Sequence, residues 1–510
     1  MTAGIFSKRC CNLIYCFIII AKYLYLLYIG IFLLDGLLIS LSRQGVIKVD
    51  IAKKLSNQRL QIMLMHITAS IIFISTAEAS RLQSTVTYCA ANILLAFFAN
   101  LILRLVYKNS AHALYNCIFM LSSIGLIMLY RLNPALAYKQ MFFHIGGIAI
   151  LLLLPPVLTL LPRLDKFKIL YILICFGLLI ATLKMGTSQY GSKNWLKIGS
   201  FGFQPSEFIK ILFVLYLASA FSSKPKFSAV IVPTLLTLGV IAFLVVQKDL
   251  GSALIFFMTY LALLFIATGN YLYVLMGLAS VSFASVIAYK LFSHIRVRVA
   301  IWQNPWSDVT GDGYQIAQSL FAICTRGITG IGLTRGYAQK IPVVERDFIF
   351  AAICEEFGVI FAIGLIFLFV LLFLEGARCA LNSKSRFLTL MCAGLAAVLA
   401  FQSFIIIGGV VKFIPLTGVT LPFVSYGGTS LLVCYIIIAI IQWVFTRNNK
   451  YTAMPAVDTV PAIDTEFLDI PQEESVDHTN IYPSDRPEET FSLNDAIPPK
   501  KAKPERRKPF

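Results

Sequence analysis

The sequence predicts an all-α, polytopic helical membrane protein. Of its 510 residues, 58% are hydrophobic and only 13% are charged, whereas an ordinary soluble domain is roughly 45–50% apolar and about 25% charged. A bilayer core about 30 Å thick needs about 20 apolar residues per helix, and runs of that kind recur along the chain. A soluble fold is therefore excluded.

Thirteen apolar segments are candidate membrane spans, and most are joined by short polar loops. The exception is the long polar segment 295–347, which separates the tenth span from the eleventh. Within it, residues 314–326 place apolar side chains on one side of a helix, so we expect an amphipathic helix in the membrane interface. The spans fall near residues 13–41, 59–77, 87–107, 113–131, 140–161, 167–185, 206–222, 228–246, 250–267, 271–293, 348–374, 387–408 and 428–446.

Lysine and arginine concentrate in alternate loops. The net charge is +18, and basic residues follow the first, third, fifth, seventh, eleventh and last spans. Basic loops face the cytoplasm in membrane proteins, which places the N-terminus and the loops 186–205, 295–347 and 409–427 on the outer side. Because no stretch combines basic and aromatic residues as a nucleic-acid site does, we expect no nucleic-acid partner.

The C-terminal segment 448–510 differs from the rest in composition. Residues 451–510 hold 12 acidic and 7 basic residues, with many prolines and no apolar periodicity. Such a segment cannot bury enough apolar surface to fold, so we expect a disordered cytoplasmic tail. The 11 cysteines of the chain include no CxxC pair, and they indicate neither a disulfide framework nor a metal site.

Acidic residues are scarce before the tail, and nine of them fall in the outer half of the predicted topology. Carboxylates at membrane depth are energetically costly and usually mark a functional cavity. The sequence therefore predicts an acid-lined cavity that opens to the outer side. The nine are Glu78, Glu207, Asp249, Asp308, Asp312, Glu345, Asp347, Glu355 and Glu356.

Several of these charges have both a structural and a functional interpretation. Glu207 and Lys210 are spaced i,i+3 and share one helix face; the lysine either neutralises the glutamate or helps it to grip a phosphate. Asp249 and Asp347 each precede a predicted helix, where an aspartate is a good N-cap. For Asp347 the alternative is a carboxylate that takes part in chemistry.

Four blocks of the sequence resemble the SEDS family of FtsW, RodA and SpoVE. Their order and spacing match across residues 113–447. Together the blocks are far more specific than any one of them alone. They are Asn194 to Gly199 with Gln204 to Lys210; Gln247 to Gly251; Asn304 to Trp306 with Gly313 to Gln315, Gln318, Ser319, Asp347 to Phe350, Glu355 and Glu356; and Ile414 to Gly418 with Leu421 to Gly428.

The resemblance implies a ten-helix catalytic core at 111–447, preceded by about three extra transmembrane helices in residues 1–110 like those of some RodA-like proteins. Such a core polymerises lipid II into glycan strands outside the cytoplasmic membrane of a bacterium, with a polyprenyl diphosphate as leaving group. The resemblance makes Asp347 the catalytic residue. It assigns substrate binding to Trp195, Gln204, Glu207, Lys210, Asp249, Gln318 and Ser319.

The implied partners are lipid II, membrane lipids and a class B penicillin-binding protein. A divalent cation, Mg²⁺ or Mn²⁺, is compatible with a diphosphate leaving group, although no cluster of metal ligands demands one. Two other functions share the same features: a transporter that flips lipid II, and a non-catalytic scaffold for a transpeptidase. A role in elongation and a role in division both stay open.

The chain also departs from the family pattern. Asn194 stands where the family often has arginine, so Lys193 or Lys197 would have to supply the charge. Lys248 stands where the family usually has proline, and it is a further candidate for binding the diphosphate. The segment 342–347 lacks the histidine and threonine that usually precede the aspartate, so no role of theirs carries over.

Overall fold

The computed structural model describes residues 2–43, 46–108, 110–161, 163–189, 192–199, 201–223, 227–325 and 327–453. The cytoplasmic tail predicted at 448–510 lies outside these residues from position 454 onward.

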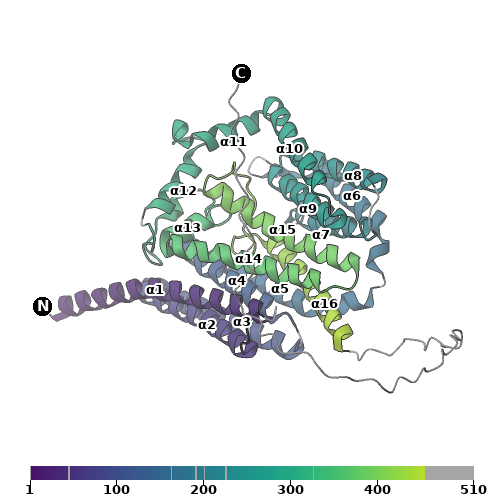
Figure 1. The fold of residues 1–510 in the computed structure, drawn as a ribbon. Coiled ribbons are helices and arrows are strands. Elements are labelled where there is room, and N and C mark those ends of the chain that lie inside the picture. The colour runs from purple at the N-terminus through teal and green to yellow at the C-terminus, as the bar shows by residue number, and fades with distance from the viewer. Residues whose placement is uncertain are drawn as a thin grey trace, which may run out of the picture. The chain divides into compact units, whose positions relative to one another are not determined.

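Helices dominate the described residues, as predicted, and twelve are long and apolar enough to cross a membrane. The chain is a multi-pass helical membrane protein (Figure 1). The twelve are α1 (Thr2–Arg43), α2 (Ile51–Thr76), α3 (Leu82–Val106), α4 (His112–Leu132), α5 (Pro134–Leu160), α6 (Lys168–Met185), α8 (Phe227–Val246), α9 (Leu250–Thr268), α10 (Tyr271–Leu291), α14 (Val359–Leu381), α15 (Arg386–Val410) and α16 (Gly428–Ala453).

Two of the thirteen predicted spans take a different form. The segment 206–222 is α7 (Pro205–Ala220), whose 16 residues are fewer than the about 20 that a bilayer needs; most of its side chains are buried within the bundle. The segment 348–374 is divided at Gly358 into α13 (Ile349–Phe357) and α14. Gly358 has φ 90°, a conformation that side chains with a Cβ rarely adopt, so the helix breaks there.

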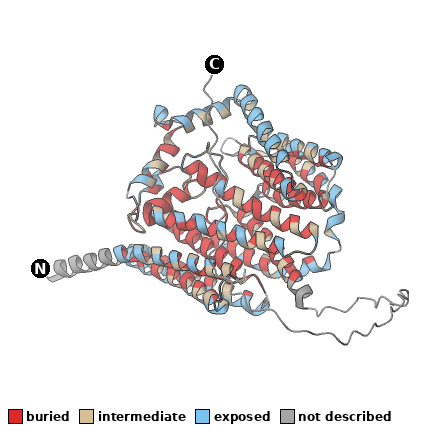
Figure 2. Ribbon diagram, viewed as in Figure 1, coloured by how far each residue is buried: buried red, intermediate tan, exposed pale blue. Residues whose placement is uncertain are grey.

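Buried residues concentrate in the middle of the bundle and not in its outer helices. Every residue between positions 113 and 130 of α4 is buried, whereas α10 contains no buried residue (Figure 2). The N-terminal helices pack on this core: α1 contacts α14, and α2 contacts α4. The surface of α10 is apolar and exposed, as expected for a helix that faces lipid.

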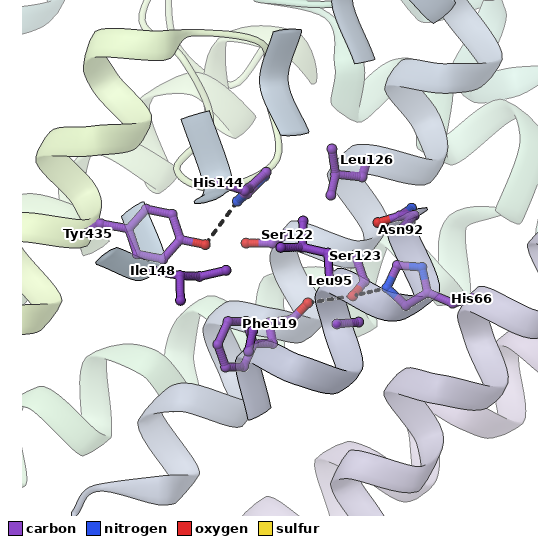
Figure 3. A pocket seen from close by; sticks show the side chains of 12 residues that line it. His66, Asn92, Leu95, Phe119, Ser122, Ser123, Leu126, His144, Ile148 and Tyr435 are labelled. Carbon is purple, nitrogen blue, oxygen red and sulfur yellow. Dashed lines mark hydrogen bonds between the residues drawn. The ribbon is translucent and has the colours of Figure 1, made fainter. Parts of the chain in front are cut away.

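A small polar chamber lies where the N-terminal helices meet the core (Figure 3). His66 of α2 lies with its Nε2 2.7 Å from Ser123 Oγ of α4, and His144 of α5 lies with its Nδ1 2.9 Å from the Tyr435 hydroxyl of α16. The cavity between them has a volume of about 20 Å³, which is room for one water. Since a buried polar group needs a partner, the His66–Ser123 pair fixes how α2 packs on α4, whereas the His144–Tyr435 pair joins two core helices, α5 and α16.

The long polar loop contains the predicted amphipathic helix, observed as α12 (Tyr314–Cys324). It also contains a second helix, α11 (Ser293–Gln303), and two short 3₁₀ helices, η3 (Pro305–Asp308) and η4 (Ala338–Lys340). Helix α12 packs against α13. The loop is therefore a folded layer, which brings α11 and α12 beside the segment that leads into α13.

The fold also contains a three-stranded antiparallel sheet that the sequence analysis did not predict. Its strands are β1 (Thr187–Gln189), β2 (Ser192–Ile198) and β3 (Phe201–Phe203), in the order β1-β2-β3. β2 pairs with both neighbours and packs against α6 and α7. This sheet holds the residues around Trp195 in place.

Candidate active site

A polar cavity of about 420 Å³ lies between β2, the long polar loop and the segment 416–420. It contains three of the eight predicted site residues, namely Trp195, Gln204 and Asp347. The other five do not line it. Its walls are formed by Ser192, Asn194, Trp195, Gln204, Arg298, Ile301, Asp312, Gln315, Ile316, Val343, Arg346, Asp347, Leu416, Thr417, Gly418 and Thr420.

Asp347 is partly buried in this cavity and does not cap a helix. The N-cap of α13 is Phe348, so the N-cap interpretation of Asp347 is wrong by one residue. A Cβ built on Gly418 would lie 3.7 Å from Asp347 Oδ2, which shows how closely the backbone approaches the carboxylate. Burial raises the pKa of Asp347 to about 6, while the positive charges of Arg346 and Arg298 oppose that rise.

Two arginines supply the positive charge of the cavity. Arg298 of α11 donates from Nη1 to the carbonyl oxygens of Leu416 at 3.1 Å and Thr417 at 3.4 Å, which holds the guanidinium in the wall. Burial lowers the pKa of Arg298, and Asp249 and Asp347 raise it in part.

Arg346 directly precedes Asp347 in the sequence, and its guanidinium group lies over the ring of Tyr426. Its guanidinium carbon is 5.6 Å from the centre of the Tyr426 ring, a distance at which cation–π attraction applies. Neither Arg298 nor Arg346 was among the site residues predicted from the sequence. A signal was present, because both are basic residues in a loop predicted to be outside, where the positive-inside rule disfavours them.

Asp249 lies behind the cavity wall and accepts hydrogen bonds from several neighbouring residues. As predicted, it is an N-cap: its Oδ1 accepts a hydrogen bond from Ser252 N at 3.1 Å at the start of α9. Its Oδ2 accepts from Asn194 Nδ2 at 3.2 Å, Gln204 Nε2 at 3.1 Å and Ser206 Oγ at 3.3 Å. Asn194 therefore serves this network where the family often has a charged residue.

The three lysines predicted to supply phosphate-binding charge lie elsewhere. Lys193, Lys197 and Lys248 are exposed and do not line the cavity. The backbone of Lys248 has φ 61°, which a proline, fixed near −65°, cannot adopt.

Glu207 and Lys210 form the predicted pair on one face of α7. Lys210 Nζ donates to Glu207 Oε1 at 2.8 Å and to Gln402 Oε1 at 2.7 Å, and the lysine is only 2% exposed. Gln402 in turn donates to the carbonyl of Thr420 at 2.8 Å, and Thr420 lines the cavity. The pair therefore supports the cavity wall through Gln402 and does not face the cavity itself.

Gln318 and Ser319 lie on α12 but outside the cavity wall. Ser319 is fully buried and donates to the carbonyl of Ile316 at 2.9 Å, while Gln315 and Ile316, one turn earlier, line the cavity. The sequence block located the helix correctly but not the face that it presents, because that face depends on how α12 packs on α13.

A second, apolar cavity of about 590 Å³ adjoins the polar one. It lies between α8, α9, α10 and α11, and Arg298, Leu416 and Thr417 line both cavities. An apolar groove whose end opens at a cationic group fits a molecule with a long hydrocarbon chain and an anionic head.

The end of α13 is fixed by a cluster of hydrogen bonds that the sequence analysis missed. Glu356 Oε1 accepts from Arg131 Nε at 3.0 Å and from Gly336 N at 3.2 Å, and its Oε2 accepts from Thr334 N at 3.1 Å. Glu355 Oε1 accepts from Tyr337 N at 2.9 Å. The two glutamates therefore hold the backbone of residues 334–337, part of the loop that leads to Asp347.

Comparisons with known proteins agree with the family resemblance of the sequence. The family model for FtsW, RodA and SpoVE, described as cell cycle protein, matches residues 103–450. The peptidoglycan glycosyltransferase RodA of Mycobacterium tuberculosis (strain H37Rv) is 33% identical over 390 residues, which cover 70% of this chain and 82% of that protein. Stage V sporulation protein E of Bacillus subtilis is 34% identical over 359 residues, which cover 65% and 95%.

The fold is also similar to a solved structure. A chain from a study of the structural coordination of polymerization and crosslinking by a peptidoglycan synthase complex superimposes with a TM-score of 0.57 at 27% identity. The match covers 66% of this chain and 98% of that chain.

Proposed function

The chain belongs to the FtsW, RodA and SpoVE family, and we infer that it is a peptidoglycan glycosyltransferase that polymerises lipid II. The observation that carries this function is the shared wall of the two cavities. The polar cavity holds one carboxylate candidate for the base and two arginines, and the apolar groove meets it at Arg298. A lipid-linked sugar diphosphate needs a polar, positively charged site for its sugar and diphosphate and an apolar groove for its hydrocarbon chain.

In the proposed mechanism Asp347 is the general base. The 4-hydroxyl of one sugar attacks the anomeric carbon of another, Asp347 accepts the hydroxyl proton, and the bond from that carbon to the diphosphate breaks. A pKa of about 6 leaves the carboxylate ionised near pH 7 yet close enough to that pH to be an effective base. The polyprenyl diphosphate leaves with the electron pair of the broken bond.

The leaving diphosphate develops negative charge, and Arg298 with Arg346 would stabilise it. Arginine matches phosphate oxygens with two parallel hydrogen bonds, and Arg298 is already fixed by two backbone carbonyls. Preorganised donors of this kind stabilise a transition state without rearranging during the reaction. The apolar groove beside Arg298 would receive the polyprenyl chain.

A divalent cation is part of the same proposal. Asp312 and Asp347 line one cavity, and Mg²⁺ is commonly held by one or two carboxylates together with substrate phosphates. Asp312 together with the diphosphate oxygens would hold Mg²⁺ or Mn²⁺, which would neutralise charge on the diphosphate and leave the Asp347 carboxylate available as the base.

The proposed setting is the cytoplasmic membrane, with Asp347 on the outer side and the C-terminal tail in the cytoplasm. Support comes from the alternating basic loops. Because the native Cys324 is exposed in the same outer loop, the test uses a chain whose native cysteines are replaced by serine. In that background a membrane-impermeant thiol reagent should label a Thr310→Cys variant in intact cells and should not label an Asn480→Cys variant. The opposite pattern would refute this orientation.

A class B penicillin-binding protein is the proposed partner, and the work of the pair would be polymerisation followed by crosslinking. Support comes from the similarity to a chain of a peptidoglycan synthase complex.

The decisive experiment is polymerisation of purified lipid II by the purified chain, with and without that partner. We expect glycan strands from the wild-type chain and none from Asp347→Asn. A flippase or a scaffold would make no polymer in either case, so absence of polymer from a folded wild-type chain with its partner would contradict the proposed activity.

A further inference from the structure

A third cavity, unrelated to the reaction described above, lies between the N-terminal helices and the core. Its volume is about 650 Å³, and it is lined by parts of α1 to α4 and of the loop before α13. Its charged lining residues are Arg81, Arg131, Arg335 and Glu78. Counting Glu356, which pairs with Arg131 at 3.0 Å, three guanidinium groups stand against two carboxylates, and this excess of positive charge favours an anion.

The position of this cavity along the spans identifies the level of the membrane at which it lies. α2 ends at Thr76, α4 ends at Leu132 and α5 begins at Pro134, and Thr76 and Pro134 line the cavity. Since the hydrocarbon core of a bilayer is about as thick as such a span is long, the ends of spans lie near the lipid headgroups. The anion most abundant at that level is a lipid phosphate.

The surface beside the cavity suits the hydrocarbon chains of such a lipid. Ile74 on α2, and Leu82 and Val86 on α3, are large apolar residues with 37–43% of their surfaces exposed. They lie within one or two turns of the cavity residues Thr76 and Arg81. A lipid whose chains lie along this surface would carry its phosphate to the arginines.

Two of the arginines have donors available to an anion. The side chain of Arg81 is exposed, and among the described residues it forms no ion pair with Glu78. Arg131 uses Nε for Glu356 and Nη2 for the carbonyl of Gly336 at 2.9 Å, which leaves Nη1 of its five-donor fork. Glu78 would repel an anion, so it moderates the affinity.

We propose that this cavity binds the phosphate of an anionic membrane lipid such as phosphatidylglycerol. The guanidinium groups of Arg81, Arg131 and Arg335 bind the phosphate oxygens, a geometry that arginine provides better than lysine. The lipid thereby joins the residue before α3, Arg81, and the end of α4 to residues 334–335 of the loop that Glu356 holds. The N-terminal helices thus complete a lipid site that the core alone would lack.

The test measures lipid retention by the full-length chain, purified in neutral detergent, by native mass spectrometry. Phosphatidylglycerol is titrated against phosphatidylcholine of the same chain length. We expect preference for phosphatidylglycerol, and we expect Arg81→Gln with Arg335→Gln to weaken its binding at least about tenfold, because charge-assisted hydrogen bonds to phosphate are lost. Glu78→Gln should tighten binding, since it removes the opposing charge.

Lys340→Gln is the matched control, because Lys340 is an exposed cation of the same loop that does not line the cavity; it should leave binding unchanged. Equal retention of both lipids would overturn the proposal, as would weaker binding in Glu78→Gln. Inorganic phosphate that displaces the lipid with the same affinity would assign the cavity to free phosphate and refute a lipid site. If the arginine variant fails to fold, the direction of the Glu78→Gln effect still decides.

Discussion

Helix α13 has a carboxylate near each end, and the protein holds the two in opposite ways. Glu356, near the last residue, accepts hydrogen bonds from Arg131, Gly336 and Thr334. Asp347, two residues before the first, faces a cavity of about 420 Å³, and none of the described residues donates a hydrogen bond to its carboxylate. The carboxylate of Glu356 is occupied by hydrogen bonds from the protein, whereas the carboxylate of Asp347 keeps its capacity to accept a proton.

This difference separates a positioning acid, Glu356, from Asp347, the acid that we propose as the base. Both residues are acids in the outer half of the predicted topology, and both have neighbouring arginines. A general base must still have acceptor positions available to its substrate, and Glu356 has used its positions on the loop at 334–336. Partners and solvent access, more than charge or depth, therefore distinguish their roles.

The largest expected effect comes from removing the charge of Asp347. Asp347→Asn should lower the rate of polymerisation at least about 10²-fold, the usual contribution of a general base. Its unfolding temperature should not fall, because Asp347 caps no helix and the change removes a buried charge that opposes folding at pH 7. The rate with purified lipid II and the unfolding temperature are both measured on one preparation.

Glu345→Gln is the matched control, since Glu345 lies in the same segment but does not line the cavity. It should keep most of the activity. Near-normal polymerisation by Asp347→Asn would remove Asp347 from the mechanism and leave the family membership intact.

Much of this fold followed from the sequence, because a bilayer imposes a simple pattern. Apolar runs of the right length predicted all the long helices, whereas the orientation predicted from the basic loops stays a prediction. The break at Gly358 and the shortness of α7 did not follow, since they depend on how helices pack against protein instead of lipid. The sheet at residues 187–203 was missed because it is short and lies between apolar spans that dominate the hydropathy.

The next largest effect on the rate of polymerisation should come from Arg298. Arg298→Gln removes one charged donor, and the loss of a charged hydrogen bond of about 1.5–3 kcal/mol corresponds to a rate about 10- to 100-fold lower. Because Arg298 opposes the rise in the pKa of Asp347, the variant should also shift the acid limb of the pH profile to higher pH. A lower rate with an unmoved profile would show that Arg298 acts apart from Asp347.

The site itself was only partly predictable. The motif blocks located Asp347, Trp195 and Gln204, whose positions in the cavity depend on local sequence. They did not reveal that Lys210 is buried behind the wall or that Arg298 supplies charge in its place, because α7 and α11 meet the cavity only through long-range packing. A loop arginine that runs against the positive-inside pattern was the available signal.

A smaller effect is expected from pH on the wild-type enzyme. With the pKa of Asp347 raised to about 6, the rate should be near its plateau at pH 7 and fall about tenfold from that plateau at pH 5, as the base becomes protonated. The raised pKa has the opposite consequence for stability, since the neutral carboxyl is the form that folding favours. Stability should be greatest below the ordinary pKa and decline as pH rises through 6.

The pH profile of kcat/KM with purified lipid II checks this. A rate that stays constant from pH 7 to pH 5 would mean that the group that titrates in the reaction is not Asp347.

The smallest effect on the rate should come from Glu356, even though its effect on stability is large. Glu356→Gln breaks the ion pair with Arg131, whose side chain is 15% exposed, and breaking a buried pair costs about 3 kcal/mol or more. The amide oxygen still accepts hydrogen bonds from the backbone N–H groups of the loop, so the folded fraction should keep the geometry around Asp347. We expect a lower unfolding temperature with a rate within a few-fold of wild type at low temperature.

Glu375→Gln is the control, because it breaks the ion pair with Arg43 at 3.0 Å, and Glu375 lines neither the polar cavity nor the apolar groove. It should lower stability with no change in rate. A 10²-fold loss of rate in folded Glu356→Gln would mean that both carboxylates of α13 take part in the chemistry, and the distinction between a positioning acid and a reacting acid would fail.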